Sequence, residues 1–193
     1  MVQQSEWIHQ QADKRRYHPT RSVSHFSNPF HFDPSLMVPN LLSRDRMGAF
    51  KELIDRLYLA GNVIDSLRFL QAVLDREDQQ STSLGHGIAL PHARCRSVAQ
   101  PSLAFGISRS GILFPSEIHP EPVHVICMLA VPDAVPSQYL ALLGRLAFCF
   151  QRASFLDGLF DCHTPGAMHR FMLHRLSNFQ TGQSSSTGSV PCA

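Results

Sequence analysis

The chain has 193 residues, a length that fits one folded domain with additional segments at its ends. Its 17 Lys and Arg residues and 15 Asp and Glu residues give a net charge of +2, which is too small to favour nucleic acid as a partner. No apolar run approaches the roughly 20 residues needed to cross a bilayer, and the polar N-terminus lacks the apolar centre of a signal peptide. These features predict a soluble, cytoplasmic protein without direct membrane insertion.

The two ends of the chain differ in composition from its middle. Residues 1–38 are rich in Gln, Ser, His and Pro and show neither helical nor strand periodicity, which predicts a flexible leader. Residues 177–193 are rich in Ser, Thr, Gly and Gln, which predicts a disordered tail. The predicted folded domain is therefore residues 39–176.

Two amphipathic helices are predicted at the beginning of this domain. The first has apolar residues at the spacing of one helix face, namely Phe50, Leu53, Ile54 and Leu57. Asp65 is placed to cap the second helix. Along one face of that helix lie Leu67, Leu70 and Leu74, with Phe69 and Val73 beside them.

Strands and further helices follow. Apolar runs predict strands at residues 88–90, 102–107 and 123–131, and the last is so continuously apolar that we expect a central strand covered on both faces. Pro136 is expected to open a helix, and Thr164-Pro165 to start the last one. The apolar stripe of the Pro136 helix comprises Tyr139, Leu142, Leu143, Leu146 and Phe150. Interleaved helices and strands predict an α/β layered domain.

The five cysteines and 11 histidines do not form a metal-binding pattern. The cysteine count is odd and no pair has the C-x-x-C spacing, so neither a disulfide framework nor a zinc site is favoured. His119 and His124 are five residues apart, as are His169 and His174, which does not match the four-residue spacing of helical zinc motifs. We therefore expect no metal.

The segment before and around His92 carries groups suited to phosphoryl transfer, which needs a positioned nucleophile and groups that hold negative charge. A neutral imidazole is nucleophilic near neutral pH, and Arg76 offers a guanidinium fork that matches a phosphate. Ser81, Thr82 and Ser83 provide hydroxyl donors, and Gly85 and Gly87 let backbone N–H groups come close. From spacing alone, an ordinary loop histidine after a glycine turn is the simpler interpretation.

The order of these residues resembles a known signature. An Arg76-Glu77 pair, then Ser81-Thr82, then Gly85-His86-Gly87-Ile88-Ala89-Leu90-Pro91-His92, is similar to the pattern of the fructose–mannitol class of enzyme IIA. These are phosphocarrier domains of the bacterial sugar phosphotransferase system, and the class includes the nitrogen-regulatory enzyme IIA. The similarity extends more loosely over residues 47–176.

The resemblance implies a single domain with a mixed β-sheet sandwiched between helices. It implies that His92 accepts a phosphoryl group from the phosphocarrier protein HPr and passes it to an enzyme IIB, with a phosphohistidine intermediate. By the same resemblance, Arg76 steadies the phosphate and Thr82 supplies a loop hydroxyl. No cofactor is implied, because the phosphoryl donor is itself a phosphoprotein.

One position departs from the family pattern. The family often has a second histidine near the start of the helix after the long strand, and Tyr139 stands there in this chain. A tyrosine can donate a hydrogen bond to a phosphoryl oxygen, but with a pKa of about 10 it is a poor proton acceptor at neutral pH. Its phase with Leu142 and Leu146 fits a packing role equally well.

Three functions remain open within this resemblance. The chain could serve sugar uptake together with an enzyme IIB, or it could act on a regulatory target protein as nitrogen-type enzymes IIA do. The alternative is a protein-binding module that retains the fold without transferring phosphoryl groups, an interpretation that the Tyr139 departure favours. The sequence names neither the sugar nor the target.

Overall fold

The computed structural model describes residues 30–116, 118, 120–134, 139–150 and 153–177. Its six-stranded sheet has the order β1-β5-β6-β3-β2, and β4 also pairs with β6. The strands are β1 (Met37–Val38), β2 (Ser83–Gly85), β3 (Ile88–Ala89), β4 (His92–Arg94), β5 (Ser102–Ile112) and β6 (Val123–Val131). The helices are the 3-10 helix η1 (Pro34–Leu36), α1 (Arg46–Leu59), α2 (Ser66–Gln79), α3 (Tyr139–Phe150), α4 (Ala153–Phe160) and α5 (Pro165–Ser177).

Strand β6 forms the middle of the sheet. It pairs antiparallel with β5 on one side and parallel with β3 and β4 on the other. Every residue from Val125 to Val131 is buried, which confirms the prediction of a central strand covered on both faces. Because β5 and β6 are antiparallel while the other pairs of β6 are parallel, the sheet is mixed, as expected.

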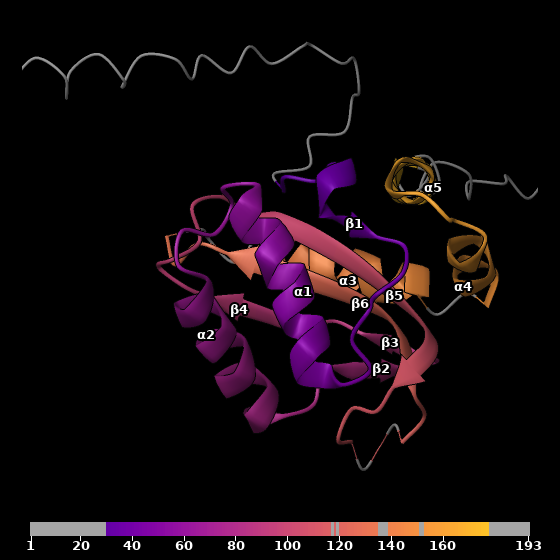
Figure 1. Ribbon diagram of the computed structural model, residues 1–193, viewed down its shortest axis with the longest axis horizontal. Helices are drawn as coiled ribbons and strands as arrows, with labels where there is room; N and C mark the ends of the chain where they lie inside the picture. The colour runs from indigo at the N-terminus through magenta and orange to yellow at the C-terminus, as the bar shows by residue number, and fades with distance from the viewer. Residues whose placement is uncertain (1–29, 117, 119, 135–138, 151–152, 178–193) are drawn as a thin grey trace, which may run out of the picture.

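Helices cover both faces of the sheet, so the predicted sandwich is confirmed. Figure 1 shows α1 and α2 in front of the sheet and α3 behind it. The apolar side chains of β6 alternate between the two layers, as they must in an extended strand. Ile126, Met128 and Ala130 join the cluster that contains α1 and α2. Val125, Cys127, Leu129 and Val131 join the cluster formed with α3, α4 and α5.

Strands β3 and β4 follow each other along one edge of β6. Strand β3 lies beside Val125 and Ile126, and β4 lies beside residues 129–131. Leu90 and Pro91 form the short break between them. His92 is therefore the first residue of a strand, whereas the sequence predicted that the strand ended before Pro91 and that His92 lay in a loop. Pairing with a distant strand decides this, because a three-residue strand carries too little periodicity to be detected.

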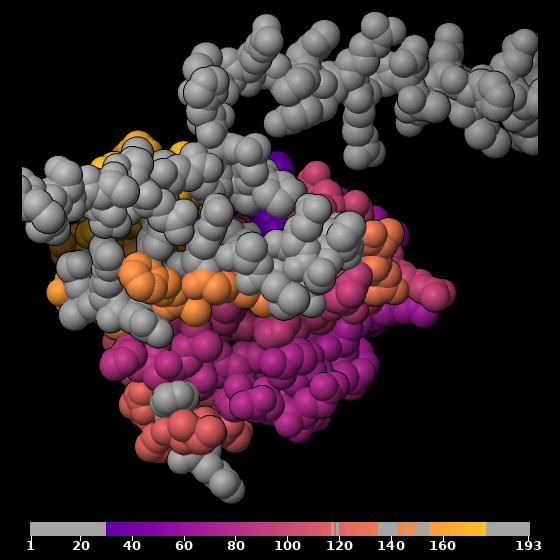
Figure 2. Space-filling model, turned by 180° about the vertical axis from the view of Figure 1, so that it is seen from behind, coloured from indigo at the N-terminus to yellow at the C-terminus, as the bar shows by residue number. Residues whose placement is uncertain are grey.

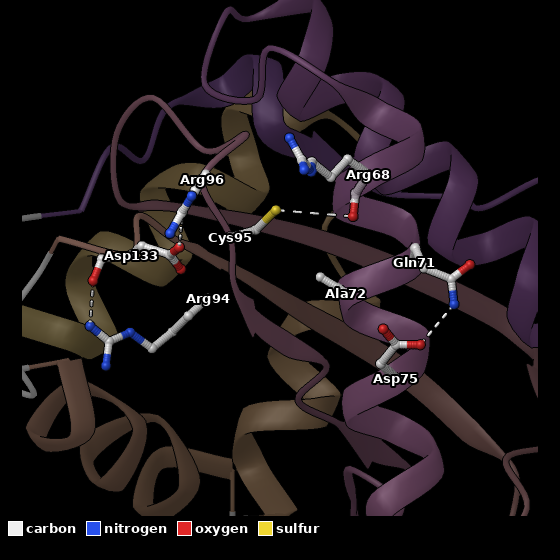
Figure 3. A pocket seen from close by; sticks show the side chains of 8 residues that line it. All are labelled: Arg68, Gln71, Ala72, Asp75, Arg94, Cys95, Arg96 and Asp133. Atoms are coloured by element: carbon white, nitrogen blue, oxygen red, sulfur yellow. Dashed lines mark hydrogen bonds and ion pairs between the residues drawn. The ribbon is translucent and has the colours of Figure 1, made fainter.

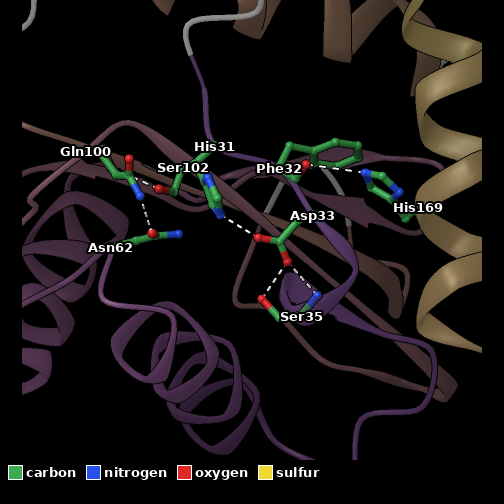
Figure 4. Close-up of polar contacts among 8 residues, drawn as sticks. All are labelled: His31, Phe32, Asp33, Ser35, Asn62, Gln100, Ser102 and His169. Carbon is green, nitrogen blue, oxygen red and sulfur yellow. Dashed lines mark hydrogen bonds and ion pairs between the residues drawn. The ribbon is translucent and has the colours of Figure 1, made fainter. Parts of the chain in front are cut away.

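The described structure begins before the predicted domain boundary. Phe30 is buried, the backbone of His31 bonds to Pro101 and Leu103, and β1 pairs in parallel with β5. Asp33 accepts hydrogen bonds from the backbone and hydroxyl of Ser35 and bonds to the His31 ring (Figure 4). The prediction of a flexible leader is therefore wrong for residues 30–38. Pairing with β5, rather than local periodicity, holds this segment, whereas residues 1–29 and 178–193 lie outside the described part of the chain.

Helix α2 begins as predicted but buries a different face. The Asp65 carboxylate accepts a hydrogen bond from the backbone N–H of Arg68 at 2.9 Å, which confirms the N-cap. Leu67, however, is 77% exposed, while Phe69, Val73 and Glu77 are buried at four-residue intervals. The packing of α2 against α1 and β4 sets this face, and the leucine spacing alone does not reveal it.

Helices α3 and α5 agree with the sequence where they are described. Leu146 and Phe150 of α3 are buried, and the Thr164 hydroxyl accepts a hydrogen bond from the Ala167 N–H at the start of α5. The predicted helix start at Pro136 lies outside the described residues, and α3 begins at Tyr139. No helix in the described part of the chain is both long and apolar enough to span a membrane.

Candidate functional site

His92 lies at the edge of the sheet, at the start of β4. Because successive side chains in a strand point to opposite faces, Ala93 packs into the core under α1 and α2 while His92 and Arg94 point away from it. The His92 side chain is partly buried. Figure 2 shows the molecule from behind, where the magenta part of the chain forms the surface below the orange part. In this segment Leu84, His86 and Arg94 are exposed, residues 88–91 are buried and His92 itself is partly exposed.

One hydrogen bond selects the tautomer of the His92 ring. Nδ1 lies 2.9 Å from the carbonyl oxygen of Leu90. A carbonyl oxygen can only accept, so Nδ1 carries the hydrogen and donates it. In the neutral ring, Nε2 then keeps its lone pair. Nε2 is therefore the nitrogen that can act as a nucleophile.

The surroundings also keep this ring neutral. Partial burial lowers the pKa of His92 below its ordinary value of 6.5, because desolvation disfavours the imidazolium. The Leu90 hydrogen bond raises the pKa, the Arg76 guanidinium lowers it and the Glu77 carboxylate raises it, and the net effect is a lowered value. At neutral pH the lone pair on Nε2 is therefore available.

The glycines before His92 build a tight turn. Gly85, His86 and Gly87 have φ angles of 79°, 53° and 73°, a run of left-handed conformations that glycine adopts without steric cost. The His86 N–H donates to the Glu121 carboxylate at 2.9 Å, and Gly87 O accepts from two residues of β6. The turn thus joins β2 to β3 and anchors both to the central strand.

Glu77 organises the segment that follows α2. Its side chain is 1% exposed, and its carboxylate accepts hydrogen bonds from the backbone N–H of Thr82 at 3.1 and 3.2 Å, the Thr82 hydroxyl and the Ser81 hydroxyl. Arg46 of α1 lies 3.7 Å away and balances the charge. The sequence alone indicates no role for Glu77 beyond its place in the Arg76-Glu77 pair. The available signal was its phase, because Glu77 lies four and eight residues after Val73 and Phe69.

The structure brings three of the four predicted site residues to one end of α2. Arg76, in the last turn, donates to Gln80 O at 2.9 Å and is close enough to His92 to lower its pKa. Thr82 follows directly after this turn and is held by Glu77. Tyr139 is the first residue of α3, but its side chain lies outside what the structure describes. Its place relative to His92 stays a prediction.

An arginine-lined hollow of about 390 Å³ lies between α2 and the end of β4 (Figure 3). Arg94, two residues after His92, donates to the Asp133 carbonyl at 2.7 Å, and Arg96 pairs with the Asp133 carboxylate at 3.4 Å. The lining residues are Arg68, Gln71, Ala72, Asp75, Arg94, Cys95, Arg96 and Asp133. Neither in this hollow nor elsewhere among the described residues are three His, Cys, Asp or Glu side chains grouped so that they could hold a metal ion.

Comparison of sequences places this geometry in context. Residues 30–175 match the family described as "Phosphoenolpyruvate-dependent sugar phosphotransferase system, EIIA 2". The chain is 32% identical over 129 residues to the PTS system fructose-specific EIIABC component of Bacillus subtilis, a match that covers 67% of this chain and 20% of that protein. It is 36% identical over 100 residues to the PTS system fructose-specific EIIA component of Haloferax volcanii, covering 52% of this chain and 64% of that one. The chain thus spans less than two thirds of either relative.

Comparison of folds gives the same picture. The crystal structure of nitrogen regulatory protein IIA-Ntr from Neisseria meningitidis has a TM-score of 0.67 and 25% identity, covering 73% of this chain and 95% of that one. The mannitol IIA enzyme of Escherichia coli, solved in complex with phosphorylated mannitol IIB enzyme, has a TM-score of 0.63 and 18% identity, covering 77% and 99%. At 18% identity this second likeness concerns the fold alone.

Proposed function

This chain belongs to the EIIA 2 family of the phosphoenolpyruvate-dependent sugar phosphotransferase system, and we propose that it carries a phosphoryl group on Nε2 of His92. The observation that carries this proposal is the hydrogen bond from Nδ1 of His92 to Leu90 O at 2.9 Å, which leaves the lone pair on Nε2. Arg76 lies close enough to act electrostatically on the ring. A nucleophile and a cation for the transferred charge therefore occur together.

The proposed reaction is a transfer between two histidines. Nε2 of His92 attacks the phosphorus of the phosphohistidine on an HPr-like protein, and the donor's P–N bond breaks as the new P–N bond forms. Nδ1 keeps its hydrogen, which it donates to Leu90 O, so no proton has to leave the His92 ring during the step. The Arg76 guanidinium stabilises the negative charge of the phosphoryl oxygens, as a fork of donors does in charge-assisted hydrogen bonds.

The proposed partner after loading is either an enzyme IIB, which takes the phosphoryl group, or a regulatory target protein, which the phosphorylated or unphosphorylated chain regulates. The Escherichia coli mannitol IIA enzyme was solved with its phosphorylated IIB enzyme, which supports an interaction of the first kind for this fold. The Neisseria protein is named as nitrogen regulatory, which supports a role of the second kind. In transfer to an enzyme IIB, the P–N bond of His92 breaks as the phosphorus forms a bond to a nucleophile of the acceptor.

Incubation with phosphoenolpyruvate, enzyme I and HPr tests the proposal. We expect the mass of the intact protein, measured under neutral conditions, to increase by one phosphoryl group. The variant His92→Ala should show no increase, whereas His163→Ala, which replaces an exposed histidine on the α4–α5 connection, should be labelled like the wild type. Undiminished labelling of His92→Ala would rule out His92 as the acceptor.

A second candidate function is a module that binds proteins but does not pass the phosphoryl group on. The observation behind it is Tyr139, which stands where the family often has a histidine. Addition of an unphosphorylated IIB domain to the labelled protein decides between the two. Loss of the label with its appearance on IIB supports a carrier, and a label that persists on His92 supports the binding module.

A further inference from the structure

We propose that Glu77 is a positioning residue, which holds the His92 ring in its reactive tautomer through a chain of hydrogen bonds that passes through Thr82 and Leu90. The inference deepens the proposed function and rests on the role of His92 as phosphoryl acceptor. It concerns two residues, Glu77 and its partner Arg46, that do not touch the transferred group.

The first link is the buried carboxylate itself. Removing a charge from water is costly unless partners compensate it, so a carboxylate that is 1% exposed must be well satisfied. Glu77 meets this condition with Arg46 at 3.7 Å and with donors from Ser81 and Thr82. Its partners thus come from α1 and from the segment that leads into β2. The carboxylate therefore ties that segment to the end of α2.

The second link runs from Thr82 to the nucleophile. The Thr82 carbonyl accepts the backbone N–H of Leu90 at 3.0 Å. The Leu90 carbonyl in turn accepts Nδ1–H of His92 at 2.9 Å. The Leu90 N–H and the Leu90 carbonyl belong to successive peptide units that meet at the Leu90 Cα. A shift of Thr82 therefore moves the Leu90 backbone, and with it the carbonyl that holds the ring. Hydrogen bonds with defined donors and acceptors therefore connect Glu77 to Thr82, Thr82 to Leu90 and Leu90 to His92.

The same geometry changes the role expected for Thr82. A threonine hydroxyl has a single hydrogen, and this one is donated to Glu77. Only oxygen lone pairs remain for other neighbours, and these cannot donate to a phosphoryl oxygen. Thr82 therefore acts on the site as a link of the chain and not as a hydrogen-bond donor to phosphate.

The variant Glu77→Gln tests this chain, with Glu52→Gln as a matched control. Glu52 is also a helix carboxylate that holds a neighbouring segment, by accepting the N–H groups of Leu42 and Ser43, but no bond links it to His92. The measurements are the ring tautomer of His92 by ¹H–¹⁵N NMR and the initial rate of labelling by phosphorylated HPr. We expect Glu77→Gln to show a mixture of tautomers and a rate about tenfold lower, the lower end of what the loss of an outer-shell hydrogen-bond partner causes at metal-binding histidines.

The control should keep the Nδ1–H tautomer and the wild-type rate. Thr82→Ser keeps the N–H and hydroxyl donors to Glu77, so its His92 tautomer and labelling rate should equal those of the wild type. Thr82→Val loses the hydroxyl, so its tautomer ratio and labelling rate should lie between those of the wild type and Glu77→Gln. If Glu77→Gln does not fold, Thr82→Val provides the same two measurements. A folded Glu77→Gln protein with wild-type tautomer and rate would overturn the inference.

Failure of the inference can be told apart from failure of the proposed function. If HPr labels the wild type but the Glu77 and Thr82 variants are unaffected, the acceptor role stands and the positioning chain is wrong. If HPr never labels the wild type, the acceptor role is wrong, and the tautomer measurement on unphosphorylated protein still decides whether Glu77 orients the His92 ring.

Discussion

A histidine is a useful nucleophile only if it is neutral and if the correct nitrogen carries the lone pair. In this protein, burial and the Arg76 cation keep the pKa of His92 low, and Leu90 O holds the hydrogen on Nδ1. The Glu77 carboxylate acts in the opposite electrostatic direction. The reactive state of His92 therefore depends on two charged neighbours that follow each other in α2.

These charges predict how His92 titrates. We expect the ring to titrate below 6.5 in the wild type and at a higher pH in Arg76→Ala, because the variant removes a cation that disfavours the imidazolium. NMR titration of the ring protons measures both values, and the exposed His163 ring in the same spectra serves as the internal control. A His92 pKa that stays the same or falls in Arg76→Ala would contradict this account.

The lowered pKa also fixes the sign of a pH effect on stability. The unfolded chain binds a proton at His92 more readily than the folded chain does, so the free energy of unfolding rises with pH in this range. The contribution of His92 to the free energy of unfolding is fully present above pH 6.5, the ordinary pKa of histidine. It is lost as the pH falls through the lower pKa of His92 in the folded chain. His92→Ala removes this part of the pH dependence.

Among the elements, α2 has the largest influence on the site. Its first turn is capped by Asp65, its middle packs on the sheet through Phe69 and Val73, and its last turn carries Arg76 and Glu77. Since the two charged residues follow the buried face, the rotation of the helix about its axis decides whether Glu77 points inward. If the helix were rotated so that Leu67 was buried, the Glu77 side chain would no longer point toward Arg46 and Thr82.

Substitutions along α2 test which face is buried. We expect Phe69→Ala to lower the free energy of unfolding by about 3–5 kcal/mol, because it leaves a cavity under a fully buried ring. Leu67→Ala should change it by less than about 0.5 kcal/mol, because Leu67 is 77% exposed. Urea unfolding of both variants gives the two values. If both variants lost the same free energy of unfolding, the face of α2 that carries Phe69 would not be the buried one.

At the scale of the whole molecule, the sheet joins segments that are far apart in the chain. Strand β1 pairs with β5, and β6 pairs with β3, β4 and β5, so both helical layers rest on pairings between distant segments. Phe30, Leu36 and Met37 add buried side chains at the β1 edge. The folded unit therefore includes residues that precede the predicted boundary at residue 39.

Two truncated chains test this boundary. A chain that begins at residue 30 should unfold at the same urea concentration as the full-length protein, in keeping with the predicted flexible leader. A chain that begins at residue 39 should lose at least about 3 kcal/mol, the cost of removing one large buried side chain, because it lacks the buried Phe30, Leu36, Met37 and Val38. If both truncated chains were as stable as the full-length protein, residues 30–38 would not belong to the folded unit.

The sequence by itself determined the features that are encoded locally. The ordered run from Arg76 to His92 indicated the family, the apolar continuity of residues 123–131 predicted the central strand, and Asp65 marked the start of α2. Each of these signals lies within one segment of chain, where periodicity, capping and residue order are visible without tertiary contacts.

Only the tertiary structure decided the features that depend on distant segments. The pairing of β1 with β5 brought residues 30–38 into the fold, and the packing of α2 buried Phe69 in place of Leu67. The same packing turned Glu77 inward to Arg46 and Thr82, and Leu90 O selected the tautomer of His92. The physical reason is that a buried charge and a ring tautomer are set by partners in space, which adjacent residues in the sequence do not specify.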